Sequence, residues 1–192
     1  KNFWPIKDIE IYSEKLKNDK IINFKANKKD LFFMIKNDEL NSIIKKELIK
    51  KSFFKYRLIR GNNFYLKLLK ENKYDLIINC DSNNPYEKKF FLKTISKNYN
   101  NFAYTTILKH NKLLNNTAIQ IFTKNGPLAF LPISNCQTSV VYSVNFEKNN
   151  FSEKDIIHLI QKHNPKYKIR EILNLNKFEL KYSHTKNYYQ QL

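Results

Sequence analysis

The stretch Thr117-Ala-Ile-Gln-Ile-Phe-Thr-Lys-Asn-Gly-Pro-Leu-Ala-Phe-Leu-Pro-Ile133 decides the fold of the central part of this chain. Two runs with apolar residues at alternate positions flank the dipeptide Asn125-Gly126. Alternation of this kind is typical of strands, and Asn-Gly supplies the positive φ angles of a tight turn. The stretch therefore predicts a β-hairpin that turns at Asn125-Gly126.

Further strands are expected on both sides of the hairpin. Isoleucine alternates with charged residues at positions 6–12, which predicts a strand with one buried face, and residues 20–26 predict its partner. The almost continuous apolar run 74–80 predicts a strand buried on both faces beside a parallel neighbour. The other elements expected from local pattern are strands at 30–35, 53–59, 102–110, 118–123, 127–133, 139–146 and 178–183 and a short helix at 86–96.

Two segments have the apolar spacing of amphipathic helices, residues 37–51 and residues 152–163. Ser152 is placed to cap the second helix with Asp155 three residues later, and Pro165 stops it. The apolar stripe of the first helix comprises Leu40, Ile43, Ile44 and Leu48. The elements together predict an α+β fold with a mainly antiparallel or mixed sheet packed on helices. A strand–helix–strand–strand unit is inserted between the two parts of that sheet.

Composition narrows the function classes. The formal net charge is +18, but only three of the 35 basic residues are arginines, and the lysines are spread along the whole chain. Nucleic-acid surfaces favour arginine for its bidentate fork, so a solvated basic surface is the expected interpretation. No apolar run approaches the roughly 18 residues of a membrane span. We therefore expect a cytoplasmic protein, with a peripheral contact at the inner membrane left open.

Several kinds of site are excluded by residue counts and spacings. Gly61 and Gly126 are the only glycines, so neither a Gly-x-Gly-x-x-Gly dinucleotide loop nor a Walker loop can form. The four histidines lack metal-ligand spacing, and no pattern identifies a catalytic side chain. Cys80 and Cys136 lie in apolar, strand-like runs, which predicts two buried free thiols.

The order Gln-x-Phe-x-x-x-Gly-Pro-Leu-Ala-x-Leu-Pro, followed by Ser139-Val-Val-Tyr-Ser143, resembles the middle segment of a known enzyme family. This family is the FAD-dependent aromatic hydroxylases of ubiquinone biosynthesis, flavin monooxygenases with the p-hydroxybenzoate hydroxylase fold. Three further stretches resemble the same family: Phe3-Trp-Pro-Ile-Lys-Asp-Ile-Glu-Ile11, Leu31-Phe-Phe-Met-Ile-Lys-Asn-Asp-Glu-Leu40 and Tyr74-Asp-Leu-Ile-Ile-Asn-Cys-Asp-Ser-Asn83. In the last of them Asn79 and Ser82 stand where the family has glycines.

The resemblance implies a division into domains and a set of site residues. It implies substrate-domain strands at 1–30, part of an FAD-binding domain at 31–85, and substrate-domain sheet and helix at 86–192. Asn37 and Asp81 match positions beside the cofactor, although Asn37 also suits a helix cap and Asp81 a turn. The hairpin would form the floor of the substrate pocket, although each of its residues also suits an ordinary sheet core. The implied pocket residues are Gln120, Phe122, Gly126, Pro127, Leu128 and Phe130.

The function implied by this resemblance is hydroxylation of an aromatic ring, on a small aromatic or prenylated phenol that is a ubiquinone precursor. The reaction needs FAD, dioxygen, and NADPH or another reductant. The chain would be the middle segment of a longer protein whose flanks hold the main FAD-binding loop, so it is expected to be inactive alone. The alternative is a basic, non-enzymatic module that binds RNA or an anionic membrane surface.

Overall fold

The computed structural model describes residues 3–16, 19–25, 29–58, 61–70, 74–81, 84–91, 94–145, 151–185 and 189. The chain divides into two compact units. The first comprises Lys1–Lys45 and Asn100–Leu180, and the second comprises Lys46–Tyr99 and Lys181–Leu192. Each unit is compact because most contacts of its residues lie within the same unit. The division into substrate-domain and FAD-domain segments stays a prediction.

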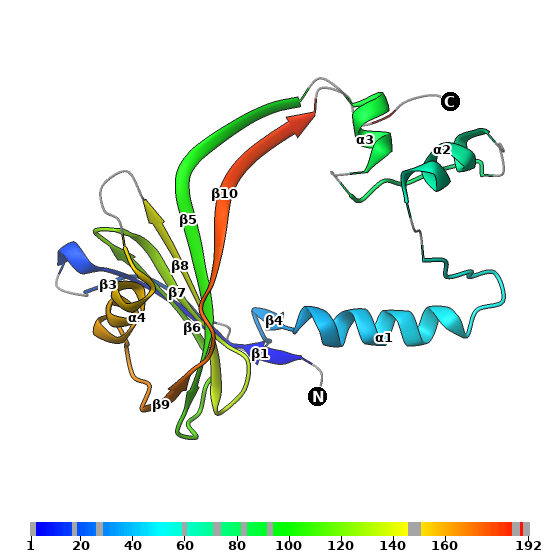
Figure 1. Cartoon of the computed structure of the whole chain (residues 1–192). Coiled ribbons are helices and arrows are strands. Elements are labelled where there is room, and N and C mark those ends of the chain that lie inside the picture. Colours follow the sequence, from blue (N-terminus) through cyan, green and yellow to red (C-terminus); the bar gives the residue numbers. More distant parts are fainter. Residues whose placement is uncertain are drawn as a thin grey trace. The chain divides into compact units, whose positions relative to one another are not determined.

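An eight-stranded mixed sheet forms the first unit's framework, so the predicted α+β class is confirmed (Figure 1). Its strand order is β10-β5-β8-β7-β6-β2-β3, and β9 pairs with β5. The pairing of β2 with β6 is parallel, whereas β6, β7 and β8 form an antiparallel meander. The strands are β2 (Asp8–Ser13), β3 (Asp19–Lys25), β5 (Thr94–His110), β6 (Thr117–Thr123), β7 (Gly126–Pro132), β8 (Gln137–Asn145), β9 (Ile169–Ile172) and β10 (Asn176–Thr185).

The predicted hairpin is confirmed, but its turn lies one residue earlier than expected. Thr123 pairs with Gly126, so the two turn residues are Lys124 and Asn125. The Thr123 hydroxyl explains the shift, because it accepts from the Asn125 backbone N–H at 3.2 Å and donates to the Gly126 carbonyl at 2.7 Å. Asn125 needs no positive φ in this arrangement, and Gly126 alone in the hairpin has one, at +139°.

One face of the sheet is buried under α4 (Glu153–Lys162), which lies across it in Figure 1. Alternate residues of β6, β7 and β8 enter this core, as the period of two in the sequence predicts. The predicted cap of α4 is confirmed as a complete capping box, in which Ser152 and Asp155 each bond the other's backbone N–H. The fully buried core includes Tyr104, Leu108, Leu128, Phe130, Val140, Tyr142, Ile156 and Ile160.

A second, two-stranded sheet pairs β1 (Trp4–Ile6) with β4 (Phe32–Met34). The short 3-10 helix η1 (Glu14–Leu16) follows β2. β4 leads into α1 (Asn37–Ile49), so the predicted helix is confirmed, although it ends two residues early. None of its residues is buried, and Ile43 and Ile44 on the apolar stripe are 37% and 47% exposed. Hydrophobic spacing therefore predicted the helix but not its environment.

The second unit departs most from the sequence predictions. Residues 53–58 and 74–80 form no strand, and Ile59 lies outside the described residues. Leu76 and Ile78 are 75% and 76% exposed, so the predicted burial of this run is wrong. A strand needs a hydrogen-bonded neighbour, and no described residues supply one to this run.

Two short helices occur in this unit. Pattern reasoning gave no element for α2 (Asn62–Lys70). The second, α3 (Pro85–Phe90), is shorter than the helix predicted at 86–96, because β5 already begins at Thr94. The Asn84 side chain caps α3, and the Tyr86 hydroxyl donates to the Tyr65 carbonyl of α2 at 2.8 Å.

Two other features of the described residues bear on function. None of the described helices has the length and apolar character needed to cross a bilayer. Cys80 and Cys136 are both exposed, so the predicted burial of the two thiols is wrong. Cys136 lies in the turn between β7 and β8, and Cys80 lies in the run that forms no strand. Neither cysteine lies in a strand of the sheet, so the apolar residues beside it in the sequence do not bury its thiol.

Candidate functional site

The strand alternation divides the predicted pocket residues between two faces of the sheet. Leu128 and Phe130 are 0% exposed and belong to the core beneath α4. Gln120 is half-buried, whereas Phe122 and its cross-strand neighbour Pro127 are exposed on the opposite face. These six residues therefore cannot all line one pocket, because neighbouring positions on a strand point in opposite directions.

The face away from α4 is open and largely apolar, and we call it the open face. A single cross-strand row crosses it from β3 to β5, and its members are Ile22, Ile11, Gln120, Ala129, Val141 and Thr105. Ile22 is 44% exposed and the other five are half-buried. Gln120 is the one amide in this row. The open face is thus a shallow, largely apolar floor on which Gln120 offers an amide that can both donate and accept hydrogen bonds.

The two predicted cofactor residues lie on different units. Asn37 is the first residue of α1 and is exposed. Asp81 is exposed in the second unit, where its backbone N–H donates to the Asn79 side-chain oxygen at 3.3 Å. Their cofactor roles stay predictions.

A cavity of about 110 Å³ lies within the first unit, where the β1–β4 pair and the start of α1 meet the turn between β7 and β8. We call it the β1–α1 cavity. Its apolar wall is built by Trp4 and its cross-strand partner Met34, with the ring of Phe3 edge-on to Phe33 at 5.0 Å. The residues lining the β1–α1 cavity are Phe3, Trp4, Met34, Ile35, Lys36, Glu39, Ile133, Ser134 and Gln137.

Two opposite charges belong to the lining of the β1–α1 cavity. The Lys36 ammonium lies 3.8 Å from the Glu39 carboxylate, and both side chains are more than two-fifths exposed. An exposed pair at this distance contributes little stability, on the order of 0–1 kcal/mol. Lys36 can therefore turn toward an anionic oxygen of a ligand at small cost.

Beneath the β1–α1 cavity lies a buried polar network centred on Asn115. The Asn115 side-chain NH2 group donates to the Ser134 carbonyl at 2.8 Å, to the Thr138 hydroxyl at 2.9 Å and to the Gln137 carbonyl at 3.3 Å. Its Oδ1 accepts from the Tyr167 hydroxyl at 3.2 Å. Burial raises the pKa of Tyr167, which keeps this hydroxyl protonated as a donor at neutral pH.

The network continues on both sides of Asn115. On one side, the Trp4 indole N–H donates to the Asn115 backbone carbonyl at 2.5 Å. On the other, the ring of buried His110 contacts the Thr138 hydroxyl at 3.0 Å and lies 4.7 Å from the Tyr167 ring. The cavity wall is thus tied through hydrogen bonds to the core of the sheet.

A second buried histidine, His163, lies at the carboxyl-terminal end of α4. His163 is 8% exposed, and its Nε2 lies 3.7 Å from a Glu14 carboxylate oxygen. The other Glu14 oxygen accepts from the Lys124 backbone N–H in the hairpin turn at 2.8 Å. Burial lowers the pKa of His163, while the Glu14 carboxylate acts in the opposite direction. This contact links α4, η1 and the hairpin turn.

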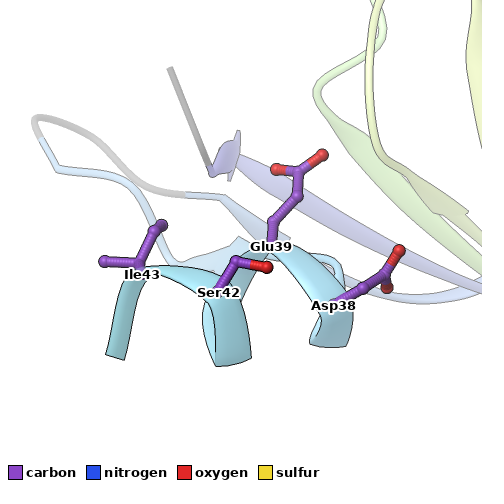
Figure 2. A pocket seen from close by; sticks show the side chains of 4 residues that line it. All are labelled: Asp38, Glu39, Ser42 and Ile43. Carbon is purple, nitrogen blue, oxygen red and sulfur yellow. The ribbon is translucent and has the colours of Figure 1, made fainter. Parts of the chain in front are cut away.

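A further depression lies on the first turns of α1, lined by Asp38, Glu39, Ser42 and Ile43. Figure 2 shows these four side chains spread along one side of the helix, with the two carboxylates pointing apart. Among the described residues, no group of three His, Cys, Asp or Glu side chains is placed to hold a metal ion. The depression therefore has no built-in ligand set.

Sequence reasoning missed most of the residues around the β1–α1 cavity. Asn115 lies between the predicted strands 102–110 and 118–123, where no motif marked it, and Gln137 lies between the predicted strands 127–133 and 139–146. The resemblance could have indicated part of the lining, because its segments 3–11 and 31–40 supply cavity residues. None of the six pocket residues that it implied in the hairpin lines this cavity. Tyr167 gave no signal, since its contact with Asn115 spans 52 positions in the sequence.

No protein-family model matches this chain. No curated protein matches it either. Among solved structures, the chain is similar to tetracycline destructase Tet(51), with 10% sequence identity and a TM-score of 0.48. The match covers 97% of this chain and 54% of that one, so the chain spans about half the length of the solved protein.

Proposed function

We propose that this chain is the aromatic-substrate portion of an FAD-dependent monooxygenase that hydroxylates a ring, with a ubiquinone-precursor phenol as the substrate class. The ring of the substrate enters the β1–α1 cavity. The remainder of the molecule lies along the open face.

One observation carries this proposal. The segments 3–11 and 31–40 both resemble the same family, and both supply residues to the β1–α1 cavity. The hairpin order that resembles this family ends at Pro132, directly before the cavity residues Ile133 and Ser134. The first of these segments lies more than 100 positions of sequence before the hairpin. The two segments and the residues that directly follow the hairpin meet at one cavity, which supports a shared function.

The cavity suits one aromatic ring in size and chemistry. A buried cavity of ~150 Å³ accepts benzene, and this cavity is somewhat smaller but continues to the surface. The Trp4 indole, the Met34 thioether and the Ile133 side chain offer apolar contact to a ring. The Lys36 ammonium and the Gln137 side-chain amide can donate hydrogen bonds to oxygen atoms on the ring. Hydroxylation needs a ring that is held in place and shielded from water, which are the protein's tasks in such a reaction.

The two glycines of the chain cannot form the Gly-x-Gly-x-x-Gly loop that holds a dinucleotide pyrophosphate. Gly126 lies in the hairpin, and the backbone around Gly61 contains no second glycine that could approach a pyrophosphate. Reduced flavin and dioxygen would supply the oxygen atom of the reaction. We propose that residues outside this sequence hold the cofactor phosphates, with Asn37 and Asp81 as contributors of a few hydrogen bonds.

The test uses Trp4, the only tryptophan of the chain, as a reporter inside the cavity. Phenol should quench or shift its fluorescence saturably, with a Kd on the order of 1 mM, which corresponds to about −4 kcal/mol. Cyclohexanol, which lacks the aromatic ring, should bind more weakly.

Two variants that each add a ring make the test specific. Ile133→Phe fills the cavity and should weaken phenol binding by about tenfold or more. Leu131→Phe adds the same ring two residues earlier, outside the cavity lining, and should bind phenol as the parent chain does. Equal phenol binding by both variants, or equal quenching of Trp4 by cyclohexanol and phenol, would show that the β1–α1 cavity is not the phenol site.

A further inference from the structure

We propose that Asn115 is the positioning residue of the β1–α1 cavity. Its buried side-chain amide holds the β7–β8 turn, and its backbone carbonyl holds Trp4 of β1. This inference rests on the proposed function for the nature of the ligand. The claim that Asn115 fixes the spacing of the cavity walls does not depend on the proposed function.

The first step is that Asn115 bonds to both sides of the cavity. Its side chain donates to the carbonyls of Ser134 and Gln137 in the turn between β7 and β8. Its backbone carbonyl accepts from the Trp4 indole of β1. Ser134, Gln137 and Trp4 all line the cavity, whereas Asn115 lies behind it and is 0% exposed. One residue is therefore bonded both to the β1 part and to the β7–β8 part of the cavity lining.

The second step is that the neighbouring backbone repeats the connection. The Leu113 N–H donates to the Asn135 carbonyl at 3.0 Å, and the Lys7 N–H donates to the Asn116 carbonyl at 2.9 Å. The segment around Asn115 is thus bonded to the β7–β8 turn on one side and to the segment after β1 on the other. The side-chain bonds of Asn115 to the β7–β8 turn add to these backbone hydrogen bonds.

The third step is that only an amide satisfies this position. The groups around the Asn115 side chain comprise two carbonyl acceptors, the Thr138 hydroxyl and the Tyr167 hydroxyl. Asparagine offers two N–H donors and an acceptor oxygen within a small volume. Aspartate keeps the shape but loses the donors, and an apolar residue leaves buried carbonyls unpaired, which is costly.

The fourth step separates positioning from general stability. The orientation of the amide depends on Tyr167, whose hydroxyl donates to Oδ1 from the loop after α4. Removing that hydroxyl should loosen the amide without removing it. Thr123, by contrast, bonds the Gly126 carbonyl and the Tyr142 hydroxyl in the hairpin turn, away from the cavity lining. Changing it should cost stability and leave the walls in place.

The experiment compares Asn115→Asp, Tyr167→Phe and the control Thr123→Val in the full chain. Two readouts are collected on each folded variant: acrylamide quenching of Trp4 fluorescence and the Kd for phenol. We expect the acrylamide quenching constant to rise about twofold in Asn115→Asp, and the phenol Kd about tenfold, as for a lost buried hydrogen bond. Tyr167→Phe should show smaller changes in the same direction, and Thr123→Val should show neither.

Each outcome decides the inference. Folded Asn115→Asp with Trp4 quenching and phenol affinity equal to those of Thr123→Val would overturn it. Should Asn115→Asp fail to fold, Tyr167→Phe decides by the same criteria. If the parent chain does not bind phenol, the proposed function fails. The Trp4 quenching of the variants still decides whether Asn115 holds the walls.

Discussion

Gly126 in β7 lies so close to Ser143 in β8 that a Cβ atom on Gly126 would stand 2.1 Å from the Ser143 carbonyl oxygen. Real Cβ contacts are never that short, and the obstacle is backbone, which cannot turn away as a side chain does. The Asn145 N–H meanwhile donates to the Asn125 carbonyl at 3.2 Å, which holds the hairpin turn against β8. Glycine is therefore required here by space as well as by its φ of +139°.

Gly126→Ala should destabilise the first unit by about 2–4 kcal/mol, because strain at a positive φ adds to the clash with β8. Urea unfolding monitored by Trp4 fluorescence measures the change. The control is Gly61→Ala, at φ +91° with no atom within 4 Å of the added Cβ, which should cost only about 1–2 kcal/mol of backbone strain. Equal losses in the two variants would show that the close approach of β7 and β8 is wrong.

Ser152→Ala should cost about 1 kcal/mol of unfolding free energy, because it removes the side chain that accepts from the Asp155 backbone N–H at the start of α4. Thermal unfolding measures the loss. Ser139→Ala is a fair comparison, since Ser139 lies in mid-strand on the open face and caps no helix. A larger loss at Ser139 than at Ser152 would contradict the capping interpretation.

The stability of the fold should fall as the pH drops below about 6.5, in part through His163. Its pKa in the folded chain is lowered by burial, so the unfolded chain binds more protons in this range and is favoured. The Glu14 carboxylate opposes this effect, and Lys162 and Lys124 reinforce it. One group can contribute at most about 1.4 kcal/mol per pH unit.

His163→Gln should therefore flatten the decline of unfolding free energy between neutral pH and pH values below about 6.5. Urea midpoints measured across this range check it. His158→Gln is the matched control on the same helix, because His158 is exposed. A decline that is equally steep in His163→Gln and in the parent chain would exclude His163 as its source.

Nucleic acid should bind this chain weakly and without sequence preference. The net charge of +18 attracts phosphates, but it comes from lysines spread along the chain, which offer no array of arginine forks to read bases. Binding measured by fluorescence anisotropy should therefore weaken steeply as salt rises, with the same slope for unrelated sequences. Tight, sequence-selective binding at physiological salt would instead favour the RNA-binding alternative.

Local pattern predicted the first unit well because its signals are local. The hairpin, the capping box at Ser152 and the alternation along β6 to β8 depend on neighbours within a few positions. The parallel pairing of β2 with β6 could not be predicted from pattern, since it joins residues more than 100 positions apart. The same holds for β9, whose four residues are too few to show a period.

The candidate site was predicted only in part for the same reason. The resemblance indicated segments, and two of them supply residues to the β1–α1 cavity. None of the six hairpin residues that it implied lines this cavity, and Leu128 and Phe130 lie in the core. Periodicity of two identifies which residues share a face without saying which face a helix covers. Asn115 and Tyr167 are joined by side-chain bonds between loops, for which no periodic signal exists.

The most direct test of the account is the indole N–H resonance of Trp4 in a ¹H–¹⁵N correlation spectrum. The chain has one tryptophan, so the indole region should contain a single peak that needs no assignment. The account predicts that this peak shifts progressively and saturably as phenol is added. Cyclohexanol should move it far less, and Ile133→Phe should require about tenfold more phenol, or still more, for the same shift. A peak that phenol leaves unmoved, while resonances elsewhere in the chain shift, would contradict an aromatic site in the β1–α1 cavity.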